Sequence, residues 1–172
     1  MYRQINLFLQ KFLKKSTILR YLFNLSPMYR RSCGRILSVS DDLTELTVKI
    51  KLSWKNVNYN GSIFGGSLFA ATDPIFMIMY NELLENNYIL WDKSAGIDFK
   101  KPAKEDVYVD FKVEASSLPD LIREVNEKGF LTFHRTIELK DKTRTKTFAT
   151  IDREIYIATF DSYRKHKERS KM

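Results

Sequence analysis

The sequence has little cysteine and little histidine. Its 172 residues include one cysteine, Cys33, and two histidines. A single cysteine excludes an internal disulfide framework, and so few side chains of these two types exclude a zinc knuckle built from them. We therefore expect a cytoplasmic protein with no metal and no cofactor.

Acidic residues are absent from residues 1–40, which contain eight Lys or Arg. Residues 161–172 are also basic, with five bases and two acids, whereas residues 41–160 contain 16 bases and 19 acids. The net charge of +8 therefore comes from the two ends of the chain. This distribution indicates that the two terminal segments contact an anionic surface. It does not indicate a nucleic-acid-binding surface on the folded domain, so we expect no nucleic-acid partner.

The length and composition fit one globular domain with short extensions. Apolar residues make up 44% of the chain and charged residues 29%, which is enough apolar surface for a real core. We divide the chain into an N-terminal amphipathic basic helix (residues 1–26), a central domain (27–160) and a basic C-terminal tail (161–172).

The opening stretch, residues 2–25, has apolar side chains at helical spacing. Four bases interrupt it and would be costly inside a bilayer, so the helix is amphipathic and does not span a membrane. Either the helix packs on its own domain, or it acts as a transit peptide or as an anchor with weak peripheral contact to a membrane. The apolar residues are Ile5, Phe8, Leu9, Phe12 and Leu13, and the bases are Lys11, Lys14, Lys15 and Arg20.

One long apolar run, residues 63–80, contains Asp73 as its only charge. Gly65 and Gly66 near its start, Pro74 in its middle and its short length argue against a membrane span. We expect a helix enclosed within the protein and kinked at Pro74. In a chain of this size, only a curved sheet is large enough to enclose such a helix.

Alternating apolar and polar residues predict the strands of that sheet. The alternation is clean in Leu46–Trp54 and Val107–Ala115, and four further stretches (33–40, 88–99, 130–140 and 146–159) are extended but less regular. Turn residues join the first and the last pair into hairpins, and a short helix over 117–129 precedes the fifth strand. This order predicts an α+β hotdog fold, in which a six-stranded antiparallel sheet wraps around one long buried helix.

Asp73 is the main candidate for chemistry. A carboxylate in an apolar helix costs several kcal/mol to bury unless it is paired or opens to a cleft, so it is a candidate catalytic group. Alternatively, Asp73 is an N-cap and Pro74 the first residue of a second helical segment. Gly65 and Gly66 would leave free N–H groups at a helix N-terminus and so form an oxyanion site, or they serve only close packing.

Lys93 is a further candidate. It lies among apolar residues if the odd positions of the third strand share one face, although its amine could also reach solvent at the sheet edge. Those positions are Ile89, Trp91, Lys93, Ala95, Ile97 and Phe99. His134 and His166 are expected in solvent, which argues against a serine triad.

Three motifs together carry a family resemblance. They are Asn58-x-x-Gly61-x-x-x-Gly65-Gly66 with Asp73 seven residues on, Trp91-Asp92-Lys93, and Ile97-Asp98-Phe99-Lys100-Lys101-Pro102. From about residue 27 to residue 158, the chain resembles the hotdog-fold acyl-CoA thioesterases of the phenylacetyl-CoA type. It is most similar to the group called domain of unknown function 4442.

The resemblance implies an acyl-CoA thioester hydrolase that pairs its sheets edge to edge into a homodimer, or a tetramer, with an acyl pocket between subunits. It places the catalytic acid on Asp73, the carbonyl-polarising amide on Gly66 and the site asparagine on Asn58. Asp73 would act as a general base on water or as a nucleophile. The expected substrate-binding residues are Gly61, Phe64, Gly65, Lys93, Lys100 and Lys101. Lys100, Lys101 and the nearby Lys104 would attract the phosphates of coenzyme A, or their loop is simply solvated.

Phe64 departs from the thioesterase pattern, because the position before the two glycines is commonly histidine in that branch. The departure favours a second hypothesis, a non-catalytic acyl or lipid carrier that retains the pocket. A third hypothesis is a membrane-surface module acting through the basic helix of residues 2–25.

Overall fold

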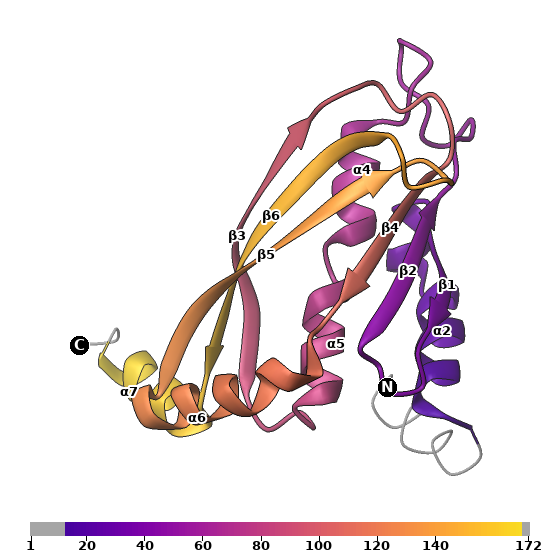
Figure 1. The fold of residues 1–172 in the computed structure, drawn as a ribbon. Helices are drawn as coiled ribbons and strands as arrows, with labels where there is room; N and C mark the ends of the chain where they lie inside the picture. The colour runs from indigo at the N-terminus through magenta and orange to yellow at the C-terminus, as the bar shows by residue number, and fades with distance from the viewer. Residues whose placement is uncertain (1–12, 170–172) are drawn as a thin grey trace.

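The structure, a computed structural model, describes residues 13–169 (Figure 1). Its helical elements are α2 (Lys15–Leu25), α3 (Pro27–Arg31), α4 (Gly65–Thr72), α5 (Ile75–Leu83), the 3-10 turn η1 (Ala115–Ser117), α6 (Leu118–Lys128) and α7 (Phe160–Arg169). The strands are β1 (Gly34–Val39), β2 (Glu45–Ile50), β3 (Ile89–Phe99), β4 (Val107–Lys112), β5 (Phe130–Lys140) and β6 (Thr147–Ala158).

The strands form one antiparallel sheet in the order β1-β2-β4-β5-β6-β3. The six predicted strands and both hairpins are confirmed. However, β2 ends before the predicted Trp54, because side chains take over from the strand ladder: the N–H of Leu52 donates to Asp106 and the N–H of Ser53 donates to Asn56. Trp54 is 84% exposed as a result.

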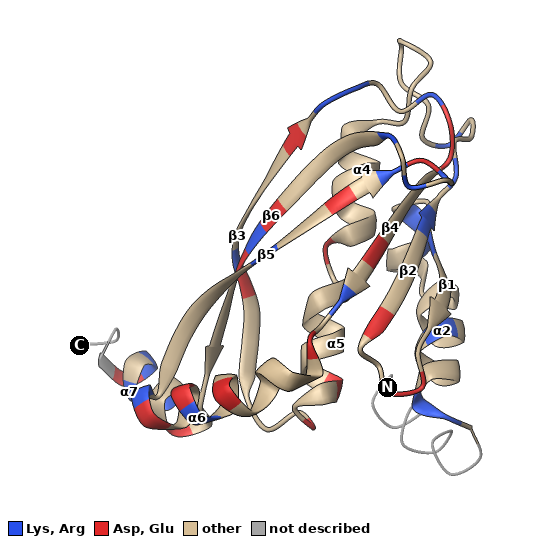
Figure 2. Ribbon diagram, in the orientation of Figure 1, with Lys and Arg blue, Asp and Glu red and all other residues tan. Residues whose placement is uncertain are grey.

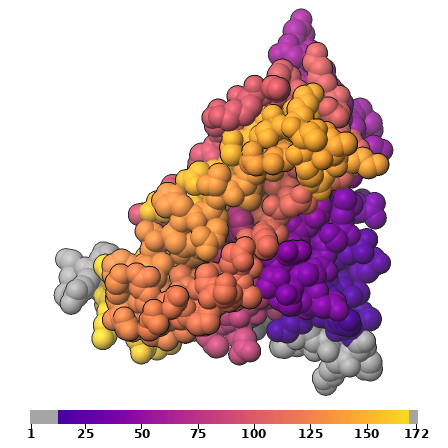
Figure 3. Space-filling model, viewed as in Figure 1, coloured from indigo at the N-terminus to yellow at the C-terminus, as the bar shows by residue number. Residues whose placement is uncertain are grey.

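The sheet curves around the helix pair α4 and α5, which confirms the predicted wrapped helix (Figure 1). In the space-filling view, the strands and α6 hide most of this pair (Figure 3). The helix breaks at Asp73 and Pro74, where the expected kink lies, and Figure 2 shows an acidic residue in the segment between the two tan helices. The buried side chains of the pair include Leu68, Ala71, Ile75, Phe76, Met79 and Tyr80.

The helix α2 covers the free edge of β1. The Asn24 side chain pairs with the backbone of Ile36 as a neighbouring strand would: its Nδ2 donates to the carbonyl (2.9 Å), and its Oδ1 accepts from the N–H (2.8 Å). Ile18 is buried, and Lys14 and Ser16 bind Asp41. The part of the predicted N-terminal helix over Lys15–Leu25 thus packs on the sheet, whereas residues 2–12 lie outside the described residues. Within 13–169 every helix is too short or too polar to cross a bilayer.

We expect Asn24→Ala to lower the free energy of unfolding by about 1–2 kcal/mol, because it removes two hydrogen bonds and uncovers backbone groups at a sheet edge. Urea denaturation measures this loss. Asn87→Ala, a substitution at an exposed position just before β3, which is at the opposite edge of the sheet from β1, is the matched control and should leave stability unchanged. Equal stability of the two variants would mean that Asn24 does not hold α2 to β1.

The C-terminal segment is helical, which the sequence pattern did not predict. Helix α7 contacts the sheet through edge-on aromatic pairs, with Tyr163 against Trp91 (ring centroids 5.7 Å apart) and His166 against Phe130 (5.6 Å). His134 is exposed, as predicted, and pairs with Asp152. The short helix predicted over 117–129 is α6, which ends at Gly129 with φ 83°, a left-handed conformation that favours glycine.

Candidate active site

Asp73 lies at the break between α4 and α5, with its side chain 58% exposed. Its backbone is helical (φ −51°, ψ −53°), whereas an N-cap residue is extended. Pro74 occupies the N-cap position of α5, and no side chain caps that helix. The interpretation of Asp73 as the cap of a second helical segment is therefore wrong. Its carboxylate is held instead by an arginine.

That arginine, Arg153, lies on the inner side of β6 and is completely buried. Its Nη1 donates to Asp92 Oδ2 (2.6 Å) and to Asp73 Oδ1 (3.3 Å), and its Nη2 donates to Thr72 Oγ1 (3.0 Å). Its guanidinium carbon lies 5.0 Å from the centre of the Phe69 ring, within range of a cation–π contact. One guanidinium from β6 therefore joins the end of α4 to a carboxylate on β3.

The two carboxylates of this cluster differ in exposure. The Asp92 side chain is 17% exposed, and burial raises its pKa although the Arg153 guanidinium opposes that shift. Asp92 Oδ1 and Arg153 Nε are buried without a hydrogen-bond partner among the described residues. Incompletely paired buried groups cost free energy and are typical of functional sites. The cluster holds Asp73 as its only largely exposed carboxylate.

Arg153 and Asp92 were not among the site residues predicted from the sequence. A signal was present, because Arg153 occupies the inward series of β6 with Ile151, Ile155 and Ile157, all completely buried. A base in such an apolar series requires a buried acid, and Asp73 and Asp92 are the acids it binds.

A β-bulge in β3 explains where Lys93 lies. The register of β3 on β6 shifts between Asp92 and Ser94, so Lys93 is an extra residue in the strand. Asp92 reaches the buried Arg153, whereas Lys93 and Ser94 bind the outer carboxylate of Glu154 at 2.9 and 3.0 Å. The prediction that the odd positions of this strand share one face is wrong, because the bulge switches faces. Lys93 lies outside the Asp73 cluster.

The other candidate residues gather at the start of α4. Gly65 and Gly66 are its first residues, and their N–H groups have no acceptor within residues 13–169. A Cβ on Gly66 would lie 2.3 Å from the Phe64 ring, and one on Gly65 would lie 2.6 Å from the Phe99 ring. Both rings are exposed, at 59% and 54%. The absence of side chains at the two glycines therefore leaves room for two aromatic rings. The glycines also provide two free N–H donors at a helix N-terminus.

Asn58 orders the loop before α4. Its Oδ1 accepts from the N–H of Asn60 (3.0 Å) and from the N–H and hydroxyl of Ser62 (both 3.1 Å). Gly61 in the same loop has φ 73°, a conformation that glycine adopts readily. The oxygen of Asn58 is thus occupied by the loop, and its Nδ2 group remains as a donor. A direct role in catalysis stays a prediction.

The lysines after β3 lie on the surface. The N–H groups of Lys100 and Lys101 donate to the carbonyl of Phe148, and the Lys100 amine pairs with Asp98. Lys101 and Lys104 are exposed and form no ion pair in the described part of the chain. These two amines are available to an anionic ligand.

One chain does not bring all the candidate groups together. Gly66 and Asp73 lie near opposite ends of α4, about 10 Å apart along the axis for seven residues of helix. Asn58 and Phe64 are at the Gly66 end, whereas Arg153 and Asp92 are at the Asp73 end. A single carbonyl group cannot contact both the Gly66 amide and the Asp73 carboxylate of one chain.

The family model described as "Domain of unknown function (DUF4442)" matches residues 15–157. No sequence among the curated proteins matches the chain significantly. Among solved structures, similarity extends to a protein of unknown function from Pseudomonas aeruginosa, named a probable thioesterase, with a TM-score of 0.74 at 18% identity over 83% of this chain and 95% of that one.

Two further structures share the fold at low identity. One is the E. coli PaaI protein from the phenylacetic acid degradation operon, with a TM-score of 0.56 at 17% identity over 80% of this chain and 90% of that one. The other is a thioesterase from Haemophilus influenzae, with a TM-score of 0.60 at 11% identity over 85% and 94% of the two chains. These similarities show a hotdog fold.

Proposed function

The chain belongs to the DUF4442 family, and we propose that it hydrolyses an acyl-CoA thioester. The observation that carries the proposal is the exposed carboxylate of Asp73 at the break of an otherwise apolar helix, held from behind by the buried Arg153. Asp92 already supplies the buried Arg153 with a carboxylate, so a second, exposed acid at position 73 is not needed to neutralise the guanidinium. Two of the similar structures, which are named a probable thioesterase and a thioesterase, support the same chemistry.

In the proposed reaction, Asp73 takes a proton from water, and the resulting hydroxide attacks the thioester carbonyl. The free Gly66 amide at the start of α4 stabilises the oxyanion that forms, and Asn58 Nδ2 can hold the carbonyl or the water. The carbon–sulfur bond then breaks, and the thiolate of coenzyme A leaves and takes up a proton. Alternatively, Asp73 attacks the carbonyl itself, and water hydrolyses the resulting anhydride.

This reaction needs two copies of the chain, because Gly66 and Asp73 of one copy are too far apart. The sheet has two edges. Asn24 and α2 cover β1, whereas β3 has a strand neighbour only on its β6 side among the described residues. An uncovered edge favours pairing with another strand. We therefore propose a homodimer joined through β3, in which each site combines Asp73 of one copy with Gly66 of the other.

Mixing inactive variants tests the shared site. Asp73→Asn removes the base. Gly66→Pro removes the amide without breaking a helical hydrogen bond, because first-turn N–H groups have no partner within the helix, and the exposed Phe64 ring has to move away from the new side chain. A refolded equimolar mixture should recover about a quarter of wild-type turnover, since half of the dimers carry one intact site. Sedimentation should show a dimer at micromolar concentration, and melting curves control for folding. A monomer, or a mixture without activity, would contradict the shared site.

The hydrolysis itself is tested with short-chain, long-chain and aromatic acyl-CoA substrates, using wild type beside Asp73→Ala. We expect turnover of at least one class by wild type and its loss in the variant. Exposed Lys101 and Lys104 would attract the phosphates of coenzyme A, so their replacement by Gln should raise KM more than it changes kcat.

Phe64 favours a second candidate function, a carrier that binds acyl groups without cleaving them. Its exposed ring lies against Gly66, where an imidazole could otherwise orient water. A carrier would bind acyl-CoA in a titration but release no free coenzyme A. If the wild-type protein bound acyl-CoA without releasing coenzyme A, the carrier function would be supported and hydrolysis contradicted.

A further inference from the structure

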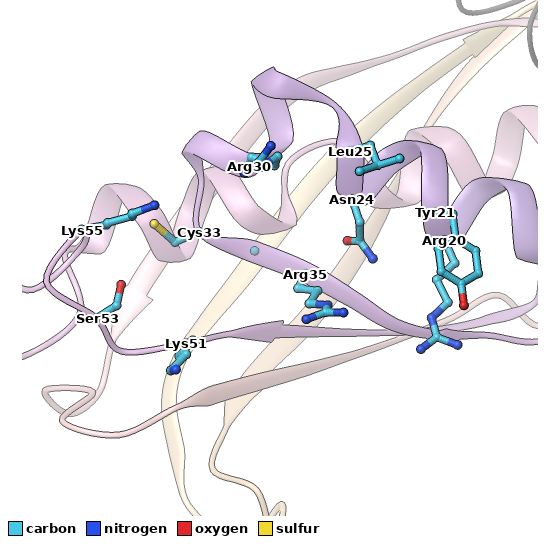
Figure 4. A pocket seen from close by; sticks show the side chains of 11 residues that line it. Arg20, Tyr21, Asn24, Leu25, Arg30, Cys33, Arg35, Lys51, Ser53 and Lys55 are labelled. Carbon is cyan, nitrogen blue, oxygen red and sulfur yellow. The ribbon is translucent and has the colours of Figure 1, made fainter.

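A groove with basic walls lies between α2, α3, β1 and the segment after β2 (Figure 4). Its volume is about 480 Å³. We call it the basic groove and define it by the five cations that line it, Arg20, Arg30, Arg35, Lys51 and Lys55. It contains no carboxylate and none of the candidate active-site residues, so it is a separate feature of the molecule.

The cations of the basic groove have little charge compensation within the described residues: one carboxylate, Asp106, acts on Lys51, and it is paired with Lys49. None of the five forms an ion pair within residues 13–169, although other surface lysines do. The contrast is clear on neighbouring strands: Lys49 pairs with Asp106 at 2.7 Å, whereas Arg35, its cross-strand partner, has no carboxylate within reach. Like charges held together repel one another, and a bound anion relieves that repulsion.

Two exposed apolar side chains line the groove, and two more belong to segments that carry its cations. Tyr21 and Leu25 line the groove and are 59% and 66% exposed, and Met28 on α3 is 60% exposed. Trp54, between the lining residues Ser53 and Lys55, is 84% exposed, and the amine of Lys55 lies 5.4 Å from its ring centre. A dissolved anion needs only the cations, whereas a lipid surface also offers an apolar environment to such side chains.

We infer that the basic groove and its apolar rim form a docking surface for an anionic phospholipid bilayer, with lipid phosphate groups in the groove. Charge complementarity and the exposed rim carry this inference, which is independent of thioester hydrolysis. The surface shares Arg20, Tyr21 and Leu25 with the contact predicted for residues 2–25 but extends beyond it. Its other four cations, Arg30, Arg35, Lys51 and Lys55, belong to the sheet and its flanking segments.

Co-sedimentation of the full chain with lipid vesicles tests the surface. Wild type should bind vesicles of phosphatidylcholine with phosphatidylglycerol at physiological salt and should bind weakly to phosphatidylcholine alone. Because each basic residue near an anionic surface contributes about fivefold in affinity, the triple variant R30Q/R35Q/K51Q should bind about a hundredfold more weakly. The matched control R123Q/K128Q/K142Q removes the same charge from α6 and the β5–β6 turn, outside both basic ends of the chain, and should bind like wild type.

Three results would overturn the inference. One is equal loss of binding in both triple variants, which would show that only net charge matters, and another is undiminished binding by R30Q/R35Q/K51Q. The third is binding of inorganic phosphate or coenzyme A in a titration by a protein that does not bind vesicles. This result would identify the groove as a site for dissolved anions. Melting curves establish that each variant is folded.

A second variant tests the apolar rim with all charges in place. L25S/M28S should bind anionic vesicles about tenfold more weakly, because two exposed side chains no longer enter the interface. The fluorescence of Trp54 should shift to shorter wavelength when wild type binds vesicles, and Trp54→Phe should lose that shift. Full binding by L25S/M28S without any shift in wild type would contradict docking through this rim.

Discussion

Asp73→Asn is expected to lower turnover on the best acyl-CoA substrate by about two orders of magnitude or more, the usual effect of removing a general base. The amide has nearly the same shape as the carboxylate but cannot accept the proton from water. Steady-state kinetics of the purified variant measures the loss. The melting temperature should hardly change, because the Asp73 side chain is 58% exposed and its one hydrogen bond to Arg153 is 3.3 Å long.

Asp152→Asn is the matched control for this prediction. Asp152 also accepts hydrogen bonds and is 51% exposed, but it pairs with His134 rather than with Arg153. Its replacement should leave turnover unchanged. If Asp73→Asn retained turnover but melted at a clearly lower temperature, Asp73 would be a structural residue of the helix break, and the proposed mechanism would lose its base.

The wrapped fold could be predicted because the spacing of apolar residues along the sequence determines most of its helices and strands. The alternation that begins at Leu46 predicts a half-exposed strand, which is β2 up to Ile50, and the apolar run around Asp73 and Pro74 predicts an enclosed, kinked helix. By contrast, the bulge at Lys93 adds one residue to a strand without changing its composition. A strict two-residue alternation continued past Lys93 therefore assigns the residues on one side of the bulge to the wrong face of the sheet.

The candidate site was predictable in part for a related reason. Asp73 is conspicuous as one charge in an apolar helix, whereas Arg153 stands between two other charged residues of its strand, Asp152 and Glu154. Its burial depends on the sheet order, which places β6 between β5 and β3 and so over the break of the helix. Helix α7 was missed because its charged composition is equally typical of a solvated tail.

Arg153→Met is expected to lower the free energy of unfolding by about 3–5 kcal/mol at neutral pH, measured by urea denaturation. Methionine fills much of the volume, but the carboxylate of Asp92, only 17% exposed, loses its ion-pair partner. An unpaired buried charge, rather than the lost attraction, causes most of the effect. The double variant R153M/D92N should therefore be clearly more stable than R153M, because its buried amide carries no charge.

The loss caused by Arg153→Met should also depend on pH. Burial already raises the pKa of Asp92 in the folded protein, and without the opposing guanidinium the shift is larger. A carboxyl whose folded-state pKa lies above its unfolded value takes up its proton first in the folded state as the pH falls. The stability deficit of R153M should thus be full at neutral pH and should shrink as the pH falls through the raised pKa, whereas R153M/D92N should show no such trend. A deficit that is the same at every pH and is not relieved by Asp92→Asn would mean that Arg153 acts through packing on Phe69 and Thr72 alone.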